Sequence, residues 1–478
     1  MMKSQRIWFD DASDLSRMKK TRFDQRSSAA PSCWRDEENC SAKFGLDGII
    51  SQLEGIEELE LGEVIELLNL WYLKDLEKIC NSPVGANTFL RLRTIQVSDC
   101  HKLKNIFSSS TVIVLLQLEE IMVSDCENME EIFAIGGQGT EVINFSKLHI
   151  VGLHNLPRLK SFCCKVKTPN SEDEIDIPTS LFNEKVVFPN LQTLNISGIH
   201  VEKIWHNLAP TLSSCVQNLT KLSVSNCGNI KELFSSSTHI FPNLETLSLS
   251  GGSYEEIFSY GEDQSQAATP AKMKILTLHN LGDLNKYMWK QDSKLESILY
   301  LEDLEVSWCH SLINLMPSSA SFQNLTCLQV FHCNSLKIII TSSMARSLVK
   351  LIRLGIGHCK NITEVVANQG DVTEDKIIFS NLKILILSDL PSLTSFCSRN
   401  LITLELPSLE EVSVAFCRNM EIFSRGDLTT QKLRKVLIDR SFYDENPDFN
   451  LNTSIEKMNA MLNSTKDSGC ASCSHHPE

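Results

Sequence analysis

One apolar pattern returns along most of this chain of 478 residues, and it constrains the fold more than any other feature. Its consensus is L-x-x-L-x-V-S-x-C-x-x-L-x-x-I, and each full copy has a cysteine at the same position: Cys100, Cys126, Cys227, Cys309, Cys333, Cys359 and Cys417. Further copies carry a leucine there: Leu73, Leu156 and Leu390. A fixed self-similar period predicts a solenoid of stacked repeats rather than a catalytic fold.

The spacing within one copy predicts a short strand followed by a turn. In L-x-V, alternate side chains lie on one face of a strand, and the later spacing of three points apolar groups back inward. Stacked copies then pair their strands in a parallel sheet. Because the strand side is narrower than the return side, we expect an α/β solenoid curved like a horseshoe, with the sheet on its concave face and irregular or short helical segments on its convex side.

A phenylalanine precedes the first leucine of several copies by three residues, which predicts a stacked phenylalanine spine: Phe89, Phe145, Phe188, Phe241, Phe322 and Phe379. We expect about 14 repeats between residues 46 and 440, a disordered or remnant segment at 1–45, and a flexible tail at 441–478. Two insertions, at residues 165–185 and 261–271, are polar and predict surface loops.

The charge and the apolar content of the chain limit the kinds of partner that we expect. The net charge is -14, and an acidic chain lacks the basic surface that general nucleic-acid binding needs. The first residues have no apolar core of a secretory signal, and no apolar stretch approaches the roughly 20 residues of a membrane span. We therefore expect a soluble, cytoplasmic protein with no membrane span, whose 17 cysteines are thiols.

The cysteine column has a structural and a chemical interpretation. In the first, a small buried S–H donates weakly to a backbone carbonyl. In the second, the column binds metal, but leucine at the same position and a linear arrangement both argue against it. Cys470 and Cys473, followed by His475, resemble zinc ligands but form a single pair in the terminal segment. We expect neither a metal nor a cofactor.

No catalytic motif is present. The chain contains no GxxxxGK[ST] phosphate loop, no HExxH and no GxSxG. Gly136, Gly137 and Gly139 form a glycine-rich segment that we assign to a loop between repeats. A non-enzymatic protein is the expectation.

The residue just before the cysteine varies in type while its neighbours do not. We expect it to project from the concave face, where aromatic and histidine side chains suit protein recognition. The candidates for a protein-binding face are Trp308, Phe331, His332, His358, Asp389, Phe416, Asp99 and Asp125. The alternative is that these are ordinary variable surface positions.

Several phrases resemble one known family. LRLRTIQVSDCHKLKNIFSSS (90–110), LQLEEIMVSDCENMEEIF (ending at Phe133) and FPNLQTLNISGIHVEKIW (188–205) are similar to the leucine-rich repeats of plant coiled-coil-type nucleotide-binding disease resistance proteins. The resemblance covers about residues 46–440, and the family's nucleotide-binding module is absent from the sequence given.

The resemblance implies a protein-recognition module of plant innate immunity. In that family the repeats contact a pathogen effector or a guarded host protein, and they restrain a nucleotide-binding switch domain. The alternative is a leucine-rich-repeat substrate adaptor of a ubiquitin ligase, a class that also places cysteine at this position. That class usually continues I-T-D after the cysteine, where this chain has Leu-Lys-x-Ile-Phe.

Overall fold

The computed structural model divides into two compact units, Met1–Leu219 and Thr220–Glu478. It describes residues 6–7, 48–51, 58–60, 65–80, 89–108, 112, 115–135, 142–165, 180–183, 186–205, 217–230, 232–234, 241–254, 256–258, 272–282, 284, 300–315, 321–367, 376–399, 402–438, 442–444 and 450–468.

The main sheet of the first unit is parallel and follows chain order. Its described strands are β2 (Gly48–Ser51), β4 (Leu67–Trp71), β6 (Thr94–Ser98), β8 (Glu120–Ser124), β11 (Ile150–Leu156) and β15 (Thr193–Ile199). In β6, Ile95 and Val97 are buried, whereas the residues between them are partly exposed. Ile95 pairs with Ile121 and Val97 with Val123, so each repeat position forms a continuous row across the sheet.

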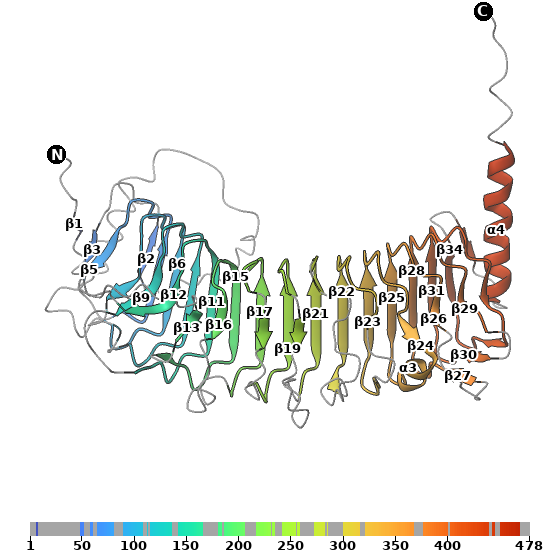
Figure 1. Cartoon of the computed structure of the whole chain (residues 1–478), viewed down its shortest axis with the longest axis horizontal. Helices are drawn as coiled ribbons and strands as arrows, with labels where there is room; N and C mark the ends of the chain where they lie inside the picture. Colours follow the sequence, from blue (N-terminus) through green and yellow to red (C-terminus); the bar gives the residue numbers. More distant parts are fainter. Residues whose placement is uncertain are drawn as a thin grey trace, which may run out of the picture. The chain divides into compact units, whose positions relative to one another are not determined.

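The second unit repeats this arrangement, and its strands lie side by side in Figure 1. The parallel strands are β17 (Lys221–Ser225), β19 (Thr246–Ser250), β21 (Ile275–His279), β22 (Asp303–Ser307), β23 (Cys327–Phe331), β25 (Arg353–Gly357), β28 (Ile384–Ser388), β31 (Glu411–Ala415) and β34 (Lys435–Ile438). A last strand, β35 (Phe442–Asp444), pairs antiparallel with β34. The predicted solenoid with a parallel sheet is confirmed.

Short strands also build the return side. In the first unit β7 (Phe107–Ser108), β9 (Glu131–Ile135) and β12 (Ser161–Lys165) pair in parallel, and in the second β24 (Ile340–Thr341), β26 (Glu364–Ala367), β29 (Ser395–Cys397) and β32 (Ile422–Ser424) do so. A one-turn-and-a-half helix, α3 (Ser342–Ser347), begins where Thr341 Oγ1 accepts a hydrogen bond from Met344 N.

The other described strands are β1 (Arg6–Ile7), β3 (Glu58–Glu60), β5 (Lys78–Cys80), β10 (Ile143–Asn144), β13 (Ser180–Phe182), β14 (Val186–Val187), β16 (Lys203–Trp205), β18 (Glu232–Phe234), β20 (Glu256–Phe258), β27 (Lys376–Ile378), β30 (Thr403–Glu405) and β33 (Leu428–Thr429). Among the described residues, the return side thus consists mainly of short strands, with α3 as a short helix.

The cysteine column lies inside the solenoid. Cys333 Sγ is 3.4 Å from Phe331 O and 3.8 Å from Val306 O, and it is fully buried. Cys359 Sγ donates to Gly357 O at 3.2 Å and accepts from Cys333 N at 3.3 Å. The weak donation to backbone carbonyls that the sequence predicts is present, and the thiols of Cys333 and Cys359 also contact the preceding repeat.

The phenylalanine spine is interrupted, which corrects the expectation. Phe145 and Phe188 belong to adjacent repeats and stack with centroids 5.7 Å apart at 11°. Elsewhere aliphatic residues take the same position, among them the buried Leu115, Leu348 and Leu406. Phe89 instead packs against Phe107, and Phe379 against Phe396, from return strands. The rings are therefore part of local aromatic clusters.

The segment expected to be a flexible tail contains regular structure. Helix α4 (Leu451–Ser468) follows β35, and Leu451, Ser454 and Ile455 are buried. Asn450 begins the helix, because its Oδ1 atom accepts hydrogen bonds from Asn452 N at 3.0 Å and Thr453 N at 3.3 Å. This helix packs at the end of the second unit (Figure 1) and closes its last repeat.

Most of the remaining expectations about loops fall on residues outside the described ranges. These are residues 166–179 of the first insertion, the second insertion at 261–271, the glycine-rich segment at 136–139, and the pair Cys470 and Cys473 with His475. The first insertion is not a surface loop throughout, because β13 (Ser180–Phe182) pairs with β16 and buries Leu181 and Phe182. Within the described chain, no helix is both long and apolar enough to cross a lipid bilayer.

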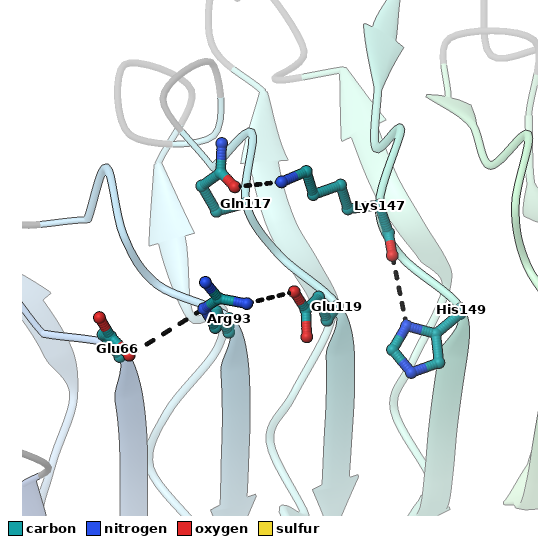
Figure 2. Close-up of polar contacts among 6 residues, drawn as sticks. All are labelled: Glu66, Arg93, Gln117, Glu119, Lys147 and His149. Atoms are coloured by element: carbon teal, nitrogen blue, oxygen red, sulfur yellow. Dashed lines mark hydrogen bonds and ion pairs between the residues drawn. The ribbon is translucent and has the colours of Figure 1, made fainter.

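Polar side chains near the amino ends of the strands bridge neighbouring repeats of the first unit (Figure 2). Arg93 Nη1 lies 2.8 Å from Glu119 Oε1, and Arg93 Nε lies 4.0 Å from Glu66 Oε2. Lys147 donates to Gln117 in the same way. Because these pairs are exposed to solvent, each contributes about 0–1 kcal/mol, so they add to the pairing of repeats without defining a site.

Candidate functional site: a left-handed column at the carboxyl ends of the strands

The variable residue before each cysteine position has a left-handed backbone conformation. Its φ angle lies between 51° and 61° in every described copy: Tyr72, Asp99, Asp125, Asn155, Gly198, Asn226, Gly251, Asn280, Trp308, His332, His358, Asp389 and Phe416. We call these residues the left-handed column. Each lies at the carboxyl end of a main-sheet strand, where the chain turns into the interior.

Backbone hydrogen bonds explain this conformation. The N–H of a column residue donates to a carbonyl of the next repeat, as Trp308 N does to Phe331 O at 3.0 Å and His332 N to Gly357 O at 2.9 Å. This bond adds a last rung to the parallel ladder. The left-handed turn then lets the following cysteine or leucine point into the core, while the column side chain stays outside.

The side chains in the column divide into two kinds. Glycine, asparagine and aspartate adopt this conformation at low cost, and they occupy most of its positions. Aromatic and histidine side chains pay roughly 1–2 kcal/mol for it. Four such residues lie in the second unit: Trp308, His332, His358 and Phe416. Strain of this kind concentrates at functional sites.

Three of those four residues form a continuous stack. Trp308 and His332 have ring centroids 3.9 Å apart at 12°, and His332 and His358 are 4.2 Å apart at 2°. His358 Nδ1 lies 2.9 Å from Asp389 Oδ2, which extends the row to a carboxylate. The structure thus brings together four of the predicted residues from four successive repeats.

Phe331 adds an apolar element beside this stack. It is the last residue of β23, and its ring lies over the glycines of β25: a Cβ atom added at Gly357 would be 2.8 Å from Phe331 Cδ1, and one at Gly355 would be 3.4 Å from Phe331 Cζ. A side chain at Gly357 would displace the ring, whereas a Cβ atom at Gly355 would only touch it. The glycines therefore allow Phe331 to lie flat on the outward face of the sheet.

The other predicted residues are placed differently. Phe416 occupies the column one repeat after Asp389, with 40% of its surface exposed. Asp99 and Asp125 lie in the first unit, where Ser98 Oγ donates to Asp99 Oδ2 and Asn155 Nδ2 donates to Asp125 Oδ1, each at 2.8 Å. Aspartate tolerates the left-handed conformation, and these hydrogen bonds stabilise its side chain. The presence of aspartate at both positions therefore has a structural explanation that the aromatic residues lack.

The stack affects the protonation of its central histidine. Burial lowers the pKa of His332, and the neighbouring His358 and His310 lower it further, whereas Asp389 acts in the opposite direction. His310 is in edge contact with Trp308, with centroids 5.9 Å apart. Neutral His332 is thus favoured, which suits packing against an indole ring.

The sequence prediction did not include other surface residues of the same sheet. Strand residues that alternate with the buried ones face outward, including Asp303, Glu305, Gln329, Arg353 and Ile386. The signal was present, because L-x-V places the intervening residue on the opposite face. The column is therefore one edge of a wider outward face of the sheet.

The side chains of this face are suited to binding another molecule. Among the described residues, no group of three histidine, cysteine, aspartate or glutamate side chains has an arrangement that could hold a metal ion. The stack instead offers planar apolar surface, hydrogen-bonding ring nitrogens and carboxylates. Such a combination is typical of protein-recognition surfaces.

Comparison with known protein families assigns this chain to one of them. The model of the leucine-rich repeats of plant disease resistance proteins, described as RPS2-like, matches residues 47–127, 74–171, 190–321 and 318–436. The chain belongs to this leucine-rich-repeat family. The match confirms the resemblance seen in the repeat phrases. No curated protein sequence gives a significant match.

Solved structures with similar folds are distant. A plant peptide hormone receptor, RGFR1 in complex with RGF2, is 14% identical, with 80% of each chain covered and a TM-score of 0.26. The leucine-rich-repeat protein LIC12759 of Leptospira interrogans is 12% identical, with 80% of this chain and 93% of that chain covered and a TM-score of 0.29. A complex of TLR13 with ssRNA13 is 12% identical, with 80% of each chain covered and a TM-score of 0.21.

Proposed function

We propose that this chain is a non-enzymatic protein-recognition module of plant innate immunity, acting in the cytoplasm. Its ligand is a pathogen effector or a guarded host protein. In a full receptor, the same repeats would also hold a nucleotide-binding switch domain in its resting state. The repeat domain spans residues 46–440 in this proposal.

The observation that carries the proposal is the strained aromatic stack of the second unit. Trp308 is 42% exposed although its backbone conformation costs energy that asparagine or glycine would avoid. A solvent-exposed tryptophan at a costly position is explained by contact with a partner, because tryptophan contributes strongly to protein interfaces. Membership of the disease resistance family supports the plant-defence context.

Proximity labelling in leaf cells tests this proposal. A biotin ligase is fused to the chain, and the labelled proteins are compared between the wild type and the variant W308A/H332A/H358A/F416A. We expect the variant to keep its folded circular dichroism signal and to lose specific labelled proteins. Labelled ubiquitin-ligase scaffold subunits would instead favour the adaptor alternative.

A matched control separates recognition from general surface loss. Tyr300, Val349 and Ile352 are apolar residues of the same unit with exposed fractions of 53%, 42% and 42%, close to those of Trp308 and Phe416. They lie before their strands, at the opposite edge from the column. The variant Y300A/V349A/I352A should label the same proteins as the wild type. An equal loss in both variants would contradict the assignment of recognition to the column.

A further inference from the structure

The strand that leads into Trp308 carries carboxylates on its outward face. Asp303 and Glu305 alternate in β22 with the buried Leu304 and Val306, and both are partly exposed. Glu302 precedes them and is exposed. Three carboxylates in four residues thus lie on the strand that leads to the aromatic stack: Glu305 is three residues before Trp308, and Asp303 and Glu302 lie at the amino end of the strand.

The neighbouring strands do not neutralise these charges. Asp303 pairs in register with Ile275 on one side and Cys327 on the other, and Glu305 pairs with Thr277 and Gln329. All four neighbours are uncharged. The outward face of β22 is therefore a negative strip between two neutral ones.

The nearest described cations are engaged or one strand further away. Lys274, at the amino edge of the preceding repeat, forms an ion pair with Glu245 at 3.1 Å. Arg353 is in register with Asp303, but Cys327 lies between them. Arg353 is therefore two strand spacings, each about 4.8 Å, away from Asp303. The negative strip thus keeps uncompensated charge that a partner can neutralise.

Trp308 presents a planar surface at one end of the stack. His332 covers one face of the indole, and His310 meets its edge. The preceding column positions hold Asn280 and Gly251, whose side chains are smaller than an indole ring. The side chains of the column directly before Trp308 are therefore smaller than those directly after it.

We propose that this surface binds an arginine-bearing, positively charged segment of the partner protein. An arginine guanidinium stacks on Trp308, and basic groups of the same segment pair with Asp303 and Glu305. The inference rests on the proposed recognition function and adds the chemistry of the ligand. Arginine fits better than lysine, because only its planar guanidinium both stacks on an aromatic ring and pairs with carboxylates.

The same charges disfavour a nucleic-acid ligand. Bases would stack on the aromatic column, but their phosphates would face Glu302, Asp303 and Glu305 without basic side chains to neutralise them. An uncharged aromatic peptide would use Trp308 and leave the negative strip unpaired. The basic peptide is the ligand that uses both features.

Fluorescence anisotropy with a defined probe tests the proposal. The probe is a capped, labelled nine-residue peptide that alternates serine with arginine, and it is added to the full chain. We expect W308A to weaken binding about tenfold and D303N/E305Q about fivefold. The lysine version of the peptide should bind more weakly, and a citrulline version, which is planar but uncharged, should not bind measurably.

Charge-matched controls come from the same unit. Asp427 and Glu456 are exposed carboxylates on other elements, so D427N/E456Q removes the same charge without touching the surface. This variant should bind the arginine peptide like the wild type. Equal binding by W308A, retained binding of the citrulline peptide, or Trp308-dependent binding of a single-stranded RNA oligomer would overturn the proposal.

The two proposals fail in different ways. If labelling in leaf cells depends on the column while the arginine peptide shows no Trp308-dependent binding, the recognition function stands and the ligand chemistry is wrong. If labelling is also independent of the column, the recognition function itself fails.

Discussion

The side-chain amide of Asn452 satisfies both backbone hydrogen-bonding groups of Ser424: Asn452 Oδ1 accepts from Ser424 N at 3.0 Å, and Asn452 Nδ2 donates to Ser424 O at 2.9 Å. The same oxygen also accepts from Phe423 N at 3.0 Å. A strand of a further repeat would make such bonds to β32. One asparagine of α4 thus replaces a missing neighbour and protects an open sheet edge.

We predict that Asn452→Ala destabilises the second unit by about 2–3 kcal/mol, because buried backbone groups of β32 lose their partners. Hydrogen exchange should accelerate at Phe423 and Ser424 in particular. Asn459→Ala, which removes a single bond to Met420 O, is the control and should cost about 1 kcal/mol. Unchanged exchange at Ser424 in the first variant would show that α4 does not close the repeat.

The left-handed column makes a conformational prediction. Asn280 has a φ of 52°, so Asn280→Gly should leave stability nearly unchanged, whereas Asn280→Val should lower it by about 1–2 kcal/mol. Chemical denaturation of both variants measures the difference. Because the side chain is exposed, packing does not explain a gap between them. Equal stabilities would contradict a backbone origin.

Tyr254 is a buried tyrosine whose hydroxyl has no hydrogen-bond partner among the described residues. It fills the space left by Gly252, which takes the place of the cysteine in its repeat: a Cβ atom on Gly252 would overlap the Tyr254 ring. We expect Tyr254→Phe to raise the free energy of unfolding by up to about 1 kcal/mol. Tyr300→Phe, on an exposed side chain, should change nothing. A destabilised Tyr254→Phe would mean that the hydroxyl has a partner.

Thiol reactivity tests the cysteine column. Burial raises the pKa of Cys359 to about 11, although its backbone contact with Cys333 acts the other way. The thiolate is the reactive form, so Cys359 should resist iodoacetamide at pH 8 in the folded protein and react after denaturation. Peptide mass spectrometry as a function of pH measures this. Fast native modification at pH 8 would contradict a neutral, buried thiol.

The His332 ring should titrate below the ordinary histidine pKa of about 6.5. A lowered pKa in the folded state means that the stabilising neutral form dominates above pH 6.5 and that this contribution is lost as the pH falls toward the folded pKa. NMR of the ring protons measures it. His358→Ala should raise the pKa of His332, and Asp389→Asn should lower it. Opposite shifts would contradict the arrangement of the stack.

The sequence predicted the repeat register well, because each copy carries its own buried apolar residues at the same spacing. Ile95 opposite Ile121 follows directly from that periodicity. The phenylalanine spine failed because the prediction counted only copies with phenylalanine and passed over intervening residues such as Leu115 and Leu348. Stacking requires aromatic rings in adjacent repeats.

The left-handed conformation was not predicted, although a signal existed. Most copies have Asp, Asn or Gly at this position, which are the residues that prefer positive φ. Trp308 and Phe416 obscure the pattern, because aromatic residues prefer negative φ and yet occupy the same position. The C-terminal helix also had a signal, since Asn450 is a favourable first cap and Leu451 and Ile455 are four residues apart. The polar composition of the segment masked it.

The left-handed column separates the residues that pack the core from the residues that face the solvent. Cys333 and Cys359 connect adjacent repeats inside the solenoid, while His332 and His358, each one residue earlier, face the solvent. Exchanging an outer side chain therefore changes the exposed surface and leaves the buried thiol contacts in place, and its cost is set by how well the new residue adopts the left-handed backbone. Under the proposed recognition function, a protein built in this way would acquire a new target by replacing single residues in successive repeats.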